Sequence, residues 1–201
     1  DVAAMVPIEF WIEARTRLSK TKNLFMLAEA GESFIHKAFD MTYNWPLKDL
    51  MNDIASGKKN AAEIIKYYES EKKDFKKKNY RMVFTSNHDE NTWNGSAVER
   101  LGPAAESFAV LCGTVSGMPL IYNGQEAGLN KRLRFFDKDT IQWKPNKMRA
   151  IYSKLNHLKI KNKSLWNGKY GGDQKFLDSN NKDVIGFIRE KDNHQVFALF
   201  N

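Results

Sequence analysis

Short apolar runs alternate with longer amphipathic segments through the first three quarters of the chain. A continuous apolar run of about four to eight residues is typical of a buried strand, and apolar residues recurring every three to four positions are typical of a helix. The predicted strands are residues 23–29, 39–43, 80–86 and 118–122, and the predicted helices are residues 8–20, 33–39, 46–56, 61–78, 102–111 and 147–161.

Polar residues follow the ends of the predicted strands. Residues 87–90 come directly after the third apolar run, and residues 123–126 come directly after the fourth. Strands separated by helices pair in parallel with right-handed crossovers, so their carboxyl ends meet at one edge of the sheet. Because α/β enzymes hold their reacting groups at that edge, the pattern predicts an α/β fold with its chemistry at the strand ends.

The pattern changes after residue 161. Residues 167–173 are rich in Asn, Gly and Asp, and a short polar turn joins the apolar runs 184–189 and 195–200. Two such runs are typical of an antiparallel hairpin. We expect residues 1–165 to form one domain, and residues 166–201 to be the start of an all-β domain that is incomplete at the end of the chain.

Composition narrows the class of protein. With 13 Phe, 7 Tyr and 5 Trp in 201 residues, the chain can build a hydrophobic core, and no apolar run approaches the roughly 20 residues that cross a bilayer. The net charge of +8 comes largely from lysines in predicted amphipathic helices, at 72–78 and 154–163 above all. We interpret them as solvated helix faces, because no nucleic-acid motif accompanies them. The single Cys112 excludes an internal disulfide and a cysteine metal site.

Three carboxylates stand at strand ends. Glu29 ends the first apolar run, Asp89 follows the third with His88 beside it, and Asp1 opens the chain. A single acid in such a place is more often a helix cap or a hydrogen-bond acceptor in a loop. Acids on successive parallel strands converge, however, and a pair of converging carboxylates is what glycoside hydrolysis requires.

The residues around these acids resemble the α-amylase family, whose retaining, α-glucan-active members are built on a (β/α)8 barrel. Residues 84–89 (FTSNHD) resemble its strand-seven motif, residues 24–30 (LFMLAEA) its strand-five motif, and residues 117–126 (GMPLIYNGQE) its strand-eight signature. Residues 136–143 are similar to the segment that follows strand eight. The resemblance implies an α/β fold that is the C-terminal half of the barrel, strands five to eight, followed by the beginning of an antiparallel β-sandwich domain.

The resemblance also implies a role for each acid. Asp1, within a stretch that resembles the tail of the strand-four motif, would be the nucleophile, Glu29 the acid/base and Asp89 the stabiliser of the transition state, while His88 would bind the substrate sugar. Asp1 is also open to interpretation as a frayed terminal residue, because the arginine that precedes it in the family motif is not in the chain. His88 is likewise open to interpretation as a buried structural histidine.

Aromatic residues near the strand ends carry a weaker signal. Tyr43, Trp45 and Trp93 are candidates for stacking on sugar rings or for ordinary packing. Glu126 ends the fourth strand and is not expected to be catalytic.

No cofactor is expected to be required for the chemistry. His36, His157 and His194 lie far apart without the spacing of metal ligands, and we expect them at the surface. Many members of the family bind calcium through an inserted domain, which would precede Asp1. Calcium binding therefore remains possible in the parent protein, although these residues do not argue for it.

The favoured function is retaining hydrolysis of α-glucosidic bonds in starch, malto-oligosaccharides or related α-glucans. Transglycosylation and a non-catalytic, amylase-like interaction subunit remain alternatives, and nucleic-acid binding rests on charge alone. The chain starts without Met or a leader, so we expect a piece of a longer parent that pairs with the N-terminal half of its own barrel and is inactive alone. Its location stays open, with a secreted or periplasmic parent favoured.

Overall fold

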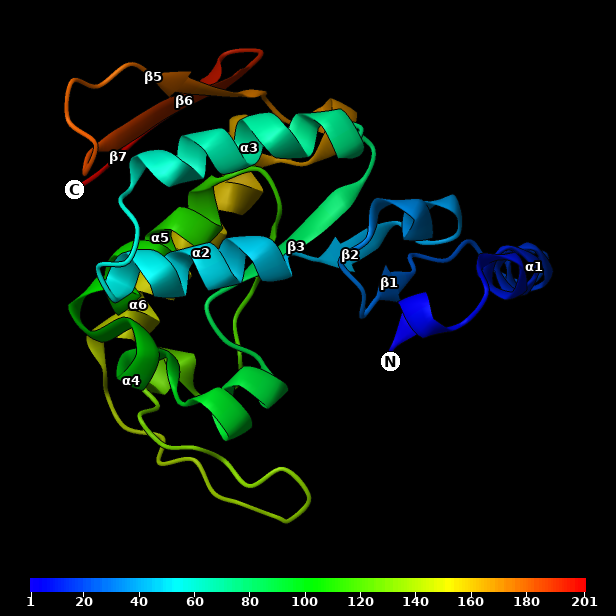
Figure 1. The fold of residues 1–201 in the computed structure, drawn as a ribbon, viewed down its shortest axis with the longest axis horizontal. Coiled ribbons are helices and arrows are strands. Elements are labelled where there is room, and N and C mark those ends of the chain that lie inside the picture. Colours follow the sequence, from blue (N-terminus) through cyan, green and yellow to red (C-terminus); the bar gives the residue numbers. More distant parts are fainter.

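A four-stranded parallel sheet forms the centre of the computed structural model, which describes residues 1–201 (Figure 1). The strands lie side by side in chain order, and every neighbouring pair is parallel, as predicted. The first and last strands are therefore the two edges of the sheet. The strands are β1 (Leu27–Ala28), β2 (Met41–Tyr43), β3 (Tyr80–Phe84) and β4 (Met118–Leu120).

The strands are shorter than their apolar runs, and β1 shows why. Only two residues of the predicted strand 23–29 pair with β2. Immediately before them, the Met26 N–H donates to the Asp40 carboxylate at 2.8 Å, and Arg15 holds the same carboxylate through two hydrogen bonds of 2.9 Å. A side chain thus takes the hydrogen bond that a longer strand would give to its neighbour.

Local chemistry sets the ends of the helices. Asn44 Oδ1 accepts from the Leu47 N–H at the start of α2 (Trp45–Ala55), and Ser96 forms a capping box with Glu99 at the start of α4 (Ala97–Leu101). The predicted helix over 102–111 starts as a 3-10 turn, η4 (Gly102–Ala104), and is α-helical from α5 (Ala105–Thr114) on. Gly102, with a φ of 53°, ends α4 before it, a helix that was not predicted. The helices are α1 (Ile8–Ser19), α2 (Trp45–Ala55), α3 (Ala62–Asp74), α4 (Ala97–Leu101), α5 (Ala105–Thr114) and α6 (Lys147–Lys161).

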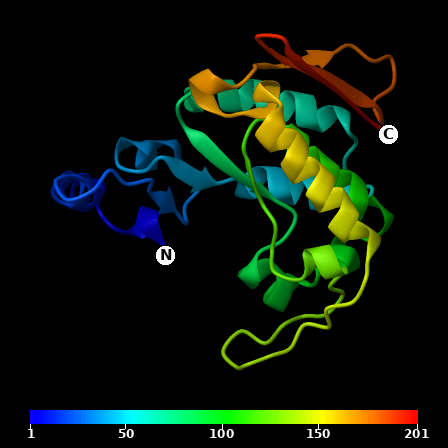
Figure 2. The same cartoon turned by 180° about the vertical axis from the view of Figure 1, so that it is seen from behind.

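The main hydrophobic core lies between the sheet, the helices and the C-terminal strands. Helices α2, α3 and α5 contribute to it, and α6 packs against α5 on the face seen in Figure 2. Val83 of β3 is completely buried among them. The other members that are at most 2% exposed are Leu47, Met51, Ile64, Leu101, Leu111, Val115, Ile185 and Phe187.

The predicted hairpin is present and belongs to a three-stranded antiparallel sheet. Asp192, with a φ of 53°, forms the turn between the two hairpin strands. Ile185 and Phe187 join the main core, so this sheet packs directly on the α/β part of the molecule. The domain boundary at residue 165 stays a prediction. The strands are β5 (Gln174–Leu177), which the pattern did not reveal, β6 (Ile185–Lys191) and β7 (His194–Phe200).

Most of the lysines on the predicted helix faces are exposed, as expected, including Lys72 and Lys73 on α3. Lys48 on α2 is buried, and Lys159 on α6 is only partly exposed. The Lys159 Nζ donates to the carbonyls of Gly117 and Leu165 at 3.0 and 2.9 Å, and burial lowers the pKa of Lys159 to about 7. No helix has both the length and the apolar character needed to span a membrane.

Candidate active site

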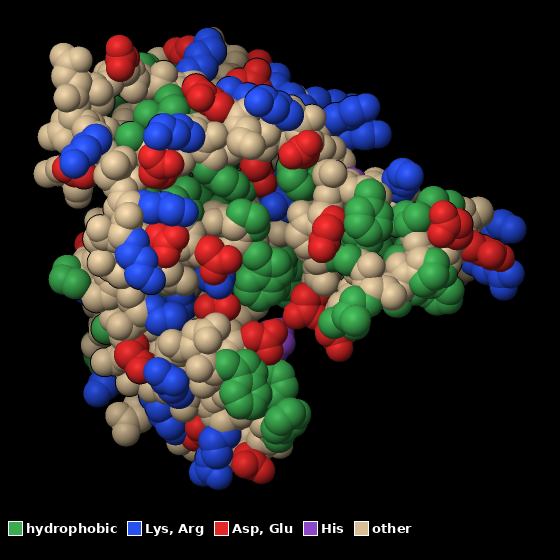
Figure 3. All heavy atoms as spheres, viewed as in Figure 1, with side chains coloured by type: hydrophobic (Ala, Val, Ile, Leu, Met, Phe, Trp, Pro, Cys, Tyr) green, Lys and Arg blue, Asp and Glu red, His purple; other side chains and the backbone are tan.

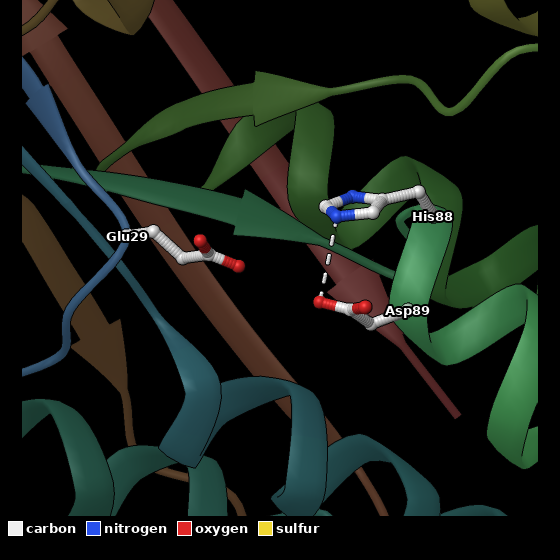
Figure 4. Close-up of side chains that lie close together, drawn as sticks. All are labelled: Glu29, His88 and Asp89. Carbon is white, nitrogen blue, oxygen red and sulfur yellow. Dashed lines mark ion pairs between the residues drawn. The ribbon is translucent and has the colours of Figure 1, made fainter. Parts of the chain in front are cut away.

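Two strand ends bring an acid pair and a histidine together, as Figure 4 shows. Glu29 directly follows β1, while His88 and Asp89 lie in the turn after β3. One side-chain oxygen or nitrogen atom from each of the three residues lies within 4.8 Å of the other two, and His88 Nε2 is 3.5 Å from Asp89 Oδ2. The geometry allows one group to exchange a proton with a bound molecule while a second carries negative charge.

The three side chains are open to a ligand. The side chains of Glu29 and Asp89 are 22% and 34% exposed, and that of His88 is 51% exposed. This exposure rules out the interpretation of His88 as a buried structural histidine. Tyr43 of β2 lies near both acids. Burial raises the pKa of Tyr43, and the negative charges of Glu29 and Asp89 raise it further.

Asp1 lies beside Glu29, but its carboxylate is not held. The Ala3 N–H donates to the Glu29 carbonyl at 3.3 Å, so the first residues of the chain run along the end of β1. The α-amino nitrogen of Asp1 is 3.9 Å from Glu29 Oε2. Its side chain is 89% exposed and makes no hydrogen bond. Asp1 is therefore a neighbour of the cluster rather than an ordered member of it.

A π-helical turn, η3 (Glu90–Asn94), follows directly after Asp89. Buried Asn87 starts it, because Asn87 Oδ1 accepts the Glu90 N–H at 2.8 Å and the Asn87 carbonyl accepts the Asn91 N–H at 3.0 Å. Single π-helical turns are rare in proteins overall, and those that occur are often found at functional sites. This turn fixes the direction in which His88 and Asp89 leave the backbone.

Beneath the cluster lies a buried ion-pair network that sequence reasoning missed. Glu90 is 5% exposed, and its Oε1 accepts from Lys48 Nζ of α2 at 2.9 Å. Its Oε2 is 3.8 Å from Arg100 Nη1 of α4, and Asn94 Nδ2 donates to Oε1 at 3.2 Å. Lys48 is 42 positions from Glu90, so no local pattern pointed to the pair. The network anchors the turn that carries Asp89 to two helices.

The other strand-end candidates divide into packing and exposed residues. Trp45 stacks on Tyr43, with ring centroids 5.3 Å apart, and meets Phe84 edge-on at 5.1 Å, so it packs below the site. Trp93 is exposed. Glu126 lies outside the cluster, and its Oε2 accepts the Gly124 N–H in the turn after β4.

The expectation that all remaining histidines lie at the surface is wrong for His36. Its ring nitrogens lie 3.2 Å from the Phe39 carbonyl and 3.0 Å from Thr42 Oγ1, and burial lowers its pKa. Its short helical segment packs this ring against the start of β2. His157 is exposed, and His194 is partly exposed.

Glu29, His88 and Asp89 are also the residues that could hold a metal ion. Calcium takes about six to eight oxygen ligands, which two carboxylates and an imidazole do not supply. A calcium site in a longer protein stays a prediction.

Comparison with known proteins identifies the family of this chain. The profile described as "Alpha amylase, catalytic domain" matches residues 6–200. The chain belongs to the α-amylase family. It is 26% identical over 178 residues to alpha-amylase 2 of Dictyoglomus thermophilum, a match that covers 81% of this chain and 30% of that protein.

Solved structures agree on the fold. The crystal structure of a noncanonic maltogenic alpha-amylase from Thermotoga neapolitana is 26% identical, with a TM-score of 0.89 over 100% of this chain and 47% of that one. A cyclic α-maltosyl-(1→6)-maltose hydrolase from Arthrobacter globiformis is 18% identical, with a TM-score of 0.83 over 99% of this chain and 47% of that one. The chain thus spans less than half of these relatives, and its parallel sheet followed by an antiparallel one matches part of their α-amylase fold.

Proposed function

We propose that the protein containing this chain hydrolyses α-glucosidic bonds in starch or malto-oligosaccharides with retention of configuration. The observation that carries the proposal is the convergence of Glu29 with His88 and Asp89, in a family member similar to proteins named α-amylases. Retaining glycosidases need one carboxylic acid that donates a proton and one carboxylate that attacks, about 5 to 5.5 Å apart.

In the proposed reaction, the Asp1 carboxylate attacks the anomeric carbon while Glu29 donates its proton to the glycosidic oxygen. The carbon–oxygen bond to the leaving sugar breaks, and a glycosyl ester on Asp1 forms. Water then gives a proton to Glu29 and attacks the same carbon, which frees Asp1. Two inversions leave the product in the α configuration.

Asp89 and His88 act on the charge that develops on the sugar. The ionised Asp89 carboxylate stabilises the oxocarbenium-like state and accepts hydrogen bonds from sugar hydroxyls, and neutral His88 hydrogen-bonds the same ring. The exposure of both side chains supports this role, because a sugar can reach them.

Asp1 is supported as the nucleophile by position. The hydrogen bond between Ala3 and Glu29 holds the first residues against the end of β1, where a neighbouring parallel strand would lie. The partner of this chain is proposed to be the other half of its own barrel. Contact with that half would order the exposed Asp1 carboxylate.

The stereochemistry of the first product tests this function. In the full-length protein acting on maltoheptaose, proton NMR within the first minutes is expected to show the α-anomer before mutarotation. Initial β-anomer would exclude the retaining mechanism, and absence of turnover on every α-glucan tried would exclude the hydrolase.

A further inference from the structure

The candidate active site continues on one side into an exposed aromatic surface. Trp93, Phe135 and Phe136, named here the aromatic patch, are 57%, 38% and 85% exposed. Ring centroids are 5.2 Å apart for Trp93 and Phe135, and 4.7 Å apart for Phe135 and Phe136. The Phe135 ring lies 5.7 Å from the His88 ring, so the patch begins at the acid cluster. Figure 3 shows hydrophobic side chains gathered next to acidic ones on this face.

Side chains of η3, the turn that carries Trp93, hold the backbone of the loop that carries Phe135 and Phe136. Thr92 Oγ1 donates to the Leu133 carbonyl at 2.7 Å, and the Leu133 N–H donates to Asn91 Oδ1 at 2.8 Å. Asn91 Nδ2 donates in turn to the Lys131 carbonyl at 3.0 Å. The turn and the loop are therefore bound to each other, while the rings of the aromatic patch stay outside the core. A contiguous exposed patch of large apolar rings is typical of an interaction or ligand-binding surface.

We propose that the aromatic patch binds a glucosyl unit of the substrate chain beyond those held at Glu29 and Asp89, and so sets a preference for longer α-glucans. The inference rests on the proposed function and names the specificity of the same site. A pyranose presents an apolar face of C–H groups to a ring and hydroxyls at its edge. The indole N–H of Trp93 makes no hydrogen bond within the chain and is free to donate to such a hydroxyl.

A sugar is the occupant that fits best, because the patch is continuous with the acid cluster through His88 and Phe135. Binding energy from a remote unit of the substrate lowers KM or raises kcat for long chains only. A short substrate that ends before the patch gains nothing from it. This difference distinguishes a sugar site from rings that only pack.

The test uses the full-length protein with maltotriose and maltoheptaose as substrates. The variants are Trp93→Ala, Phe136→Ala and the conservative Trp93→Phe, and Phe197→Ala on β7 is the matched control, since Phe197 is also 57% exposed. Trp93→Ala is expected to lower kcat/KM for maltoheptaose about tenfold and for maltotriose less than about twofold. Trp93→Phe should keep most of the rate, and Phe197→Ala should change neither.

Equal losses on the two substrates, or none, would overturn the proposal. Equal losses with a lower melting temperature would identify the patch as packing against another part of the protein or a partner. If the wild type hydrolyses neither substrate, the proposed function fails, and calorimetry with maltoheptaose decides the patch separately. Binding by the wild type that Trp93→Ala weakens about tenfold supports it, and equal or absent binding refutes it.

Discussion

Replacing Glu90 with Gln tests whether the buried ion-pair network holds the candidate active site. The change keeps the shape of the side chain and removes its charge. Lys48, which is 7% exposed, then loses its buried partner, and Arg100 loses the carboxylate 3.8 Å away. Breaking a buried pair from one side costs roughly 3 to 5 kcal/mol. Because Lys48 keeps the exposed Asp49 as a second partner, we expect about 3 kcal/mol.

Urea unfolding of the full-length protein measures this cost. The midpoint should fall with an unchanged slope, since the surface exposed on unfolding stays the same. The double variant Lys48→Met/Glu90→Gln should lose less than the sum of Lys48→Met and Glu90→Gln, because removing Glu90 no longer leaves the Lys48 ammonium buried without its partner. A loss below about 1 kcal/mol for Glu90→Gln would refute the reasoning, as would additive single changes.

Three further predictions concern stability. The pKa of Lys159 is lowered to about 7 from 10.5 in the unfolded chain, so the unfolded state binds more protons between these values and the free energy of unfolding should rise from about pH 7 to pH 10. Thermal melts should show this rise in the wild type and not in Lys159→Met. Arg189→Met should cost at least about 3 kcal/mol in urea, because the Arg189 guanidinium donates to carbonyls at the C-terminal end of α5 and to the carbonyls of Gly172 and Trp166. A smaller cost would show that water replaces these hydrogen bonds. Residues 1–201 expressed alone should aggregate and leave starch intact, because β1 and β4 are unpaired edges, and a stable active monomer would contradict this.

The parallel direction of the strands could be predicted from sequence, because their apolar runs alternate with helical segments. Their order followed from the resemblance to half of a barrel. The run at 23–29 could not show that β1 is two residues long, since Asp40 takes the preceding N–H through its side chain. The helix predicted to open at Gly102 begins as the 3-10 turn Gly102–Ala104, and α4 before it was missed, because five residues are too few to show a helical period. Local sequence patterns thus predict that an element exists more reliably than they predict its first and last residues.

Within the candidate site, the strand-end position of Glu29, His88 and Asp89 was enough to predict that they meet. Glu90 and Lys48 were not predictable, because a buried charge is recognised only through a partner distant in sequence. The exposure of Trp93 depends in the same way on the loop that carries Phe135.

The central claim is that Glu29 donates the proton that releases the leaving sugar. Turnover of maltoheptaose by full-length Glu29→Gln should fall by roughly 10² to 10⁴-fold, with KM nearly unchanged, because the amide keeps the shape and has no proton to donate. An aryl maltoside whose leaving group needs no protonation should lose far less. Glu13→Gln, on the exposed face of α1, is the matched control and should be unaffected. If Glu29→Gln keeps more than about half of the wild-type rate on maltoheptaose, or loses equally on both substrates, Glu29 is not the acid.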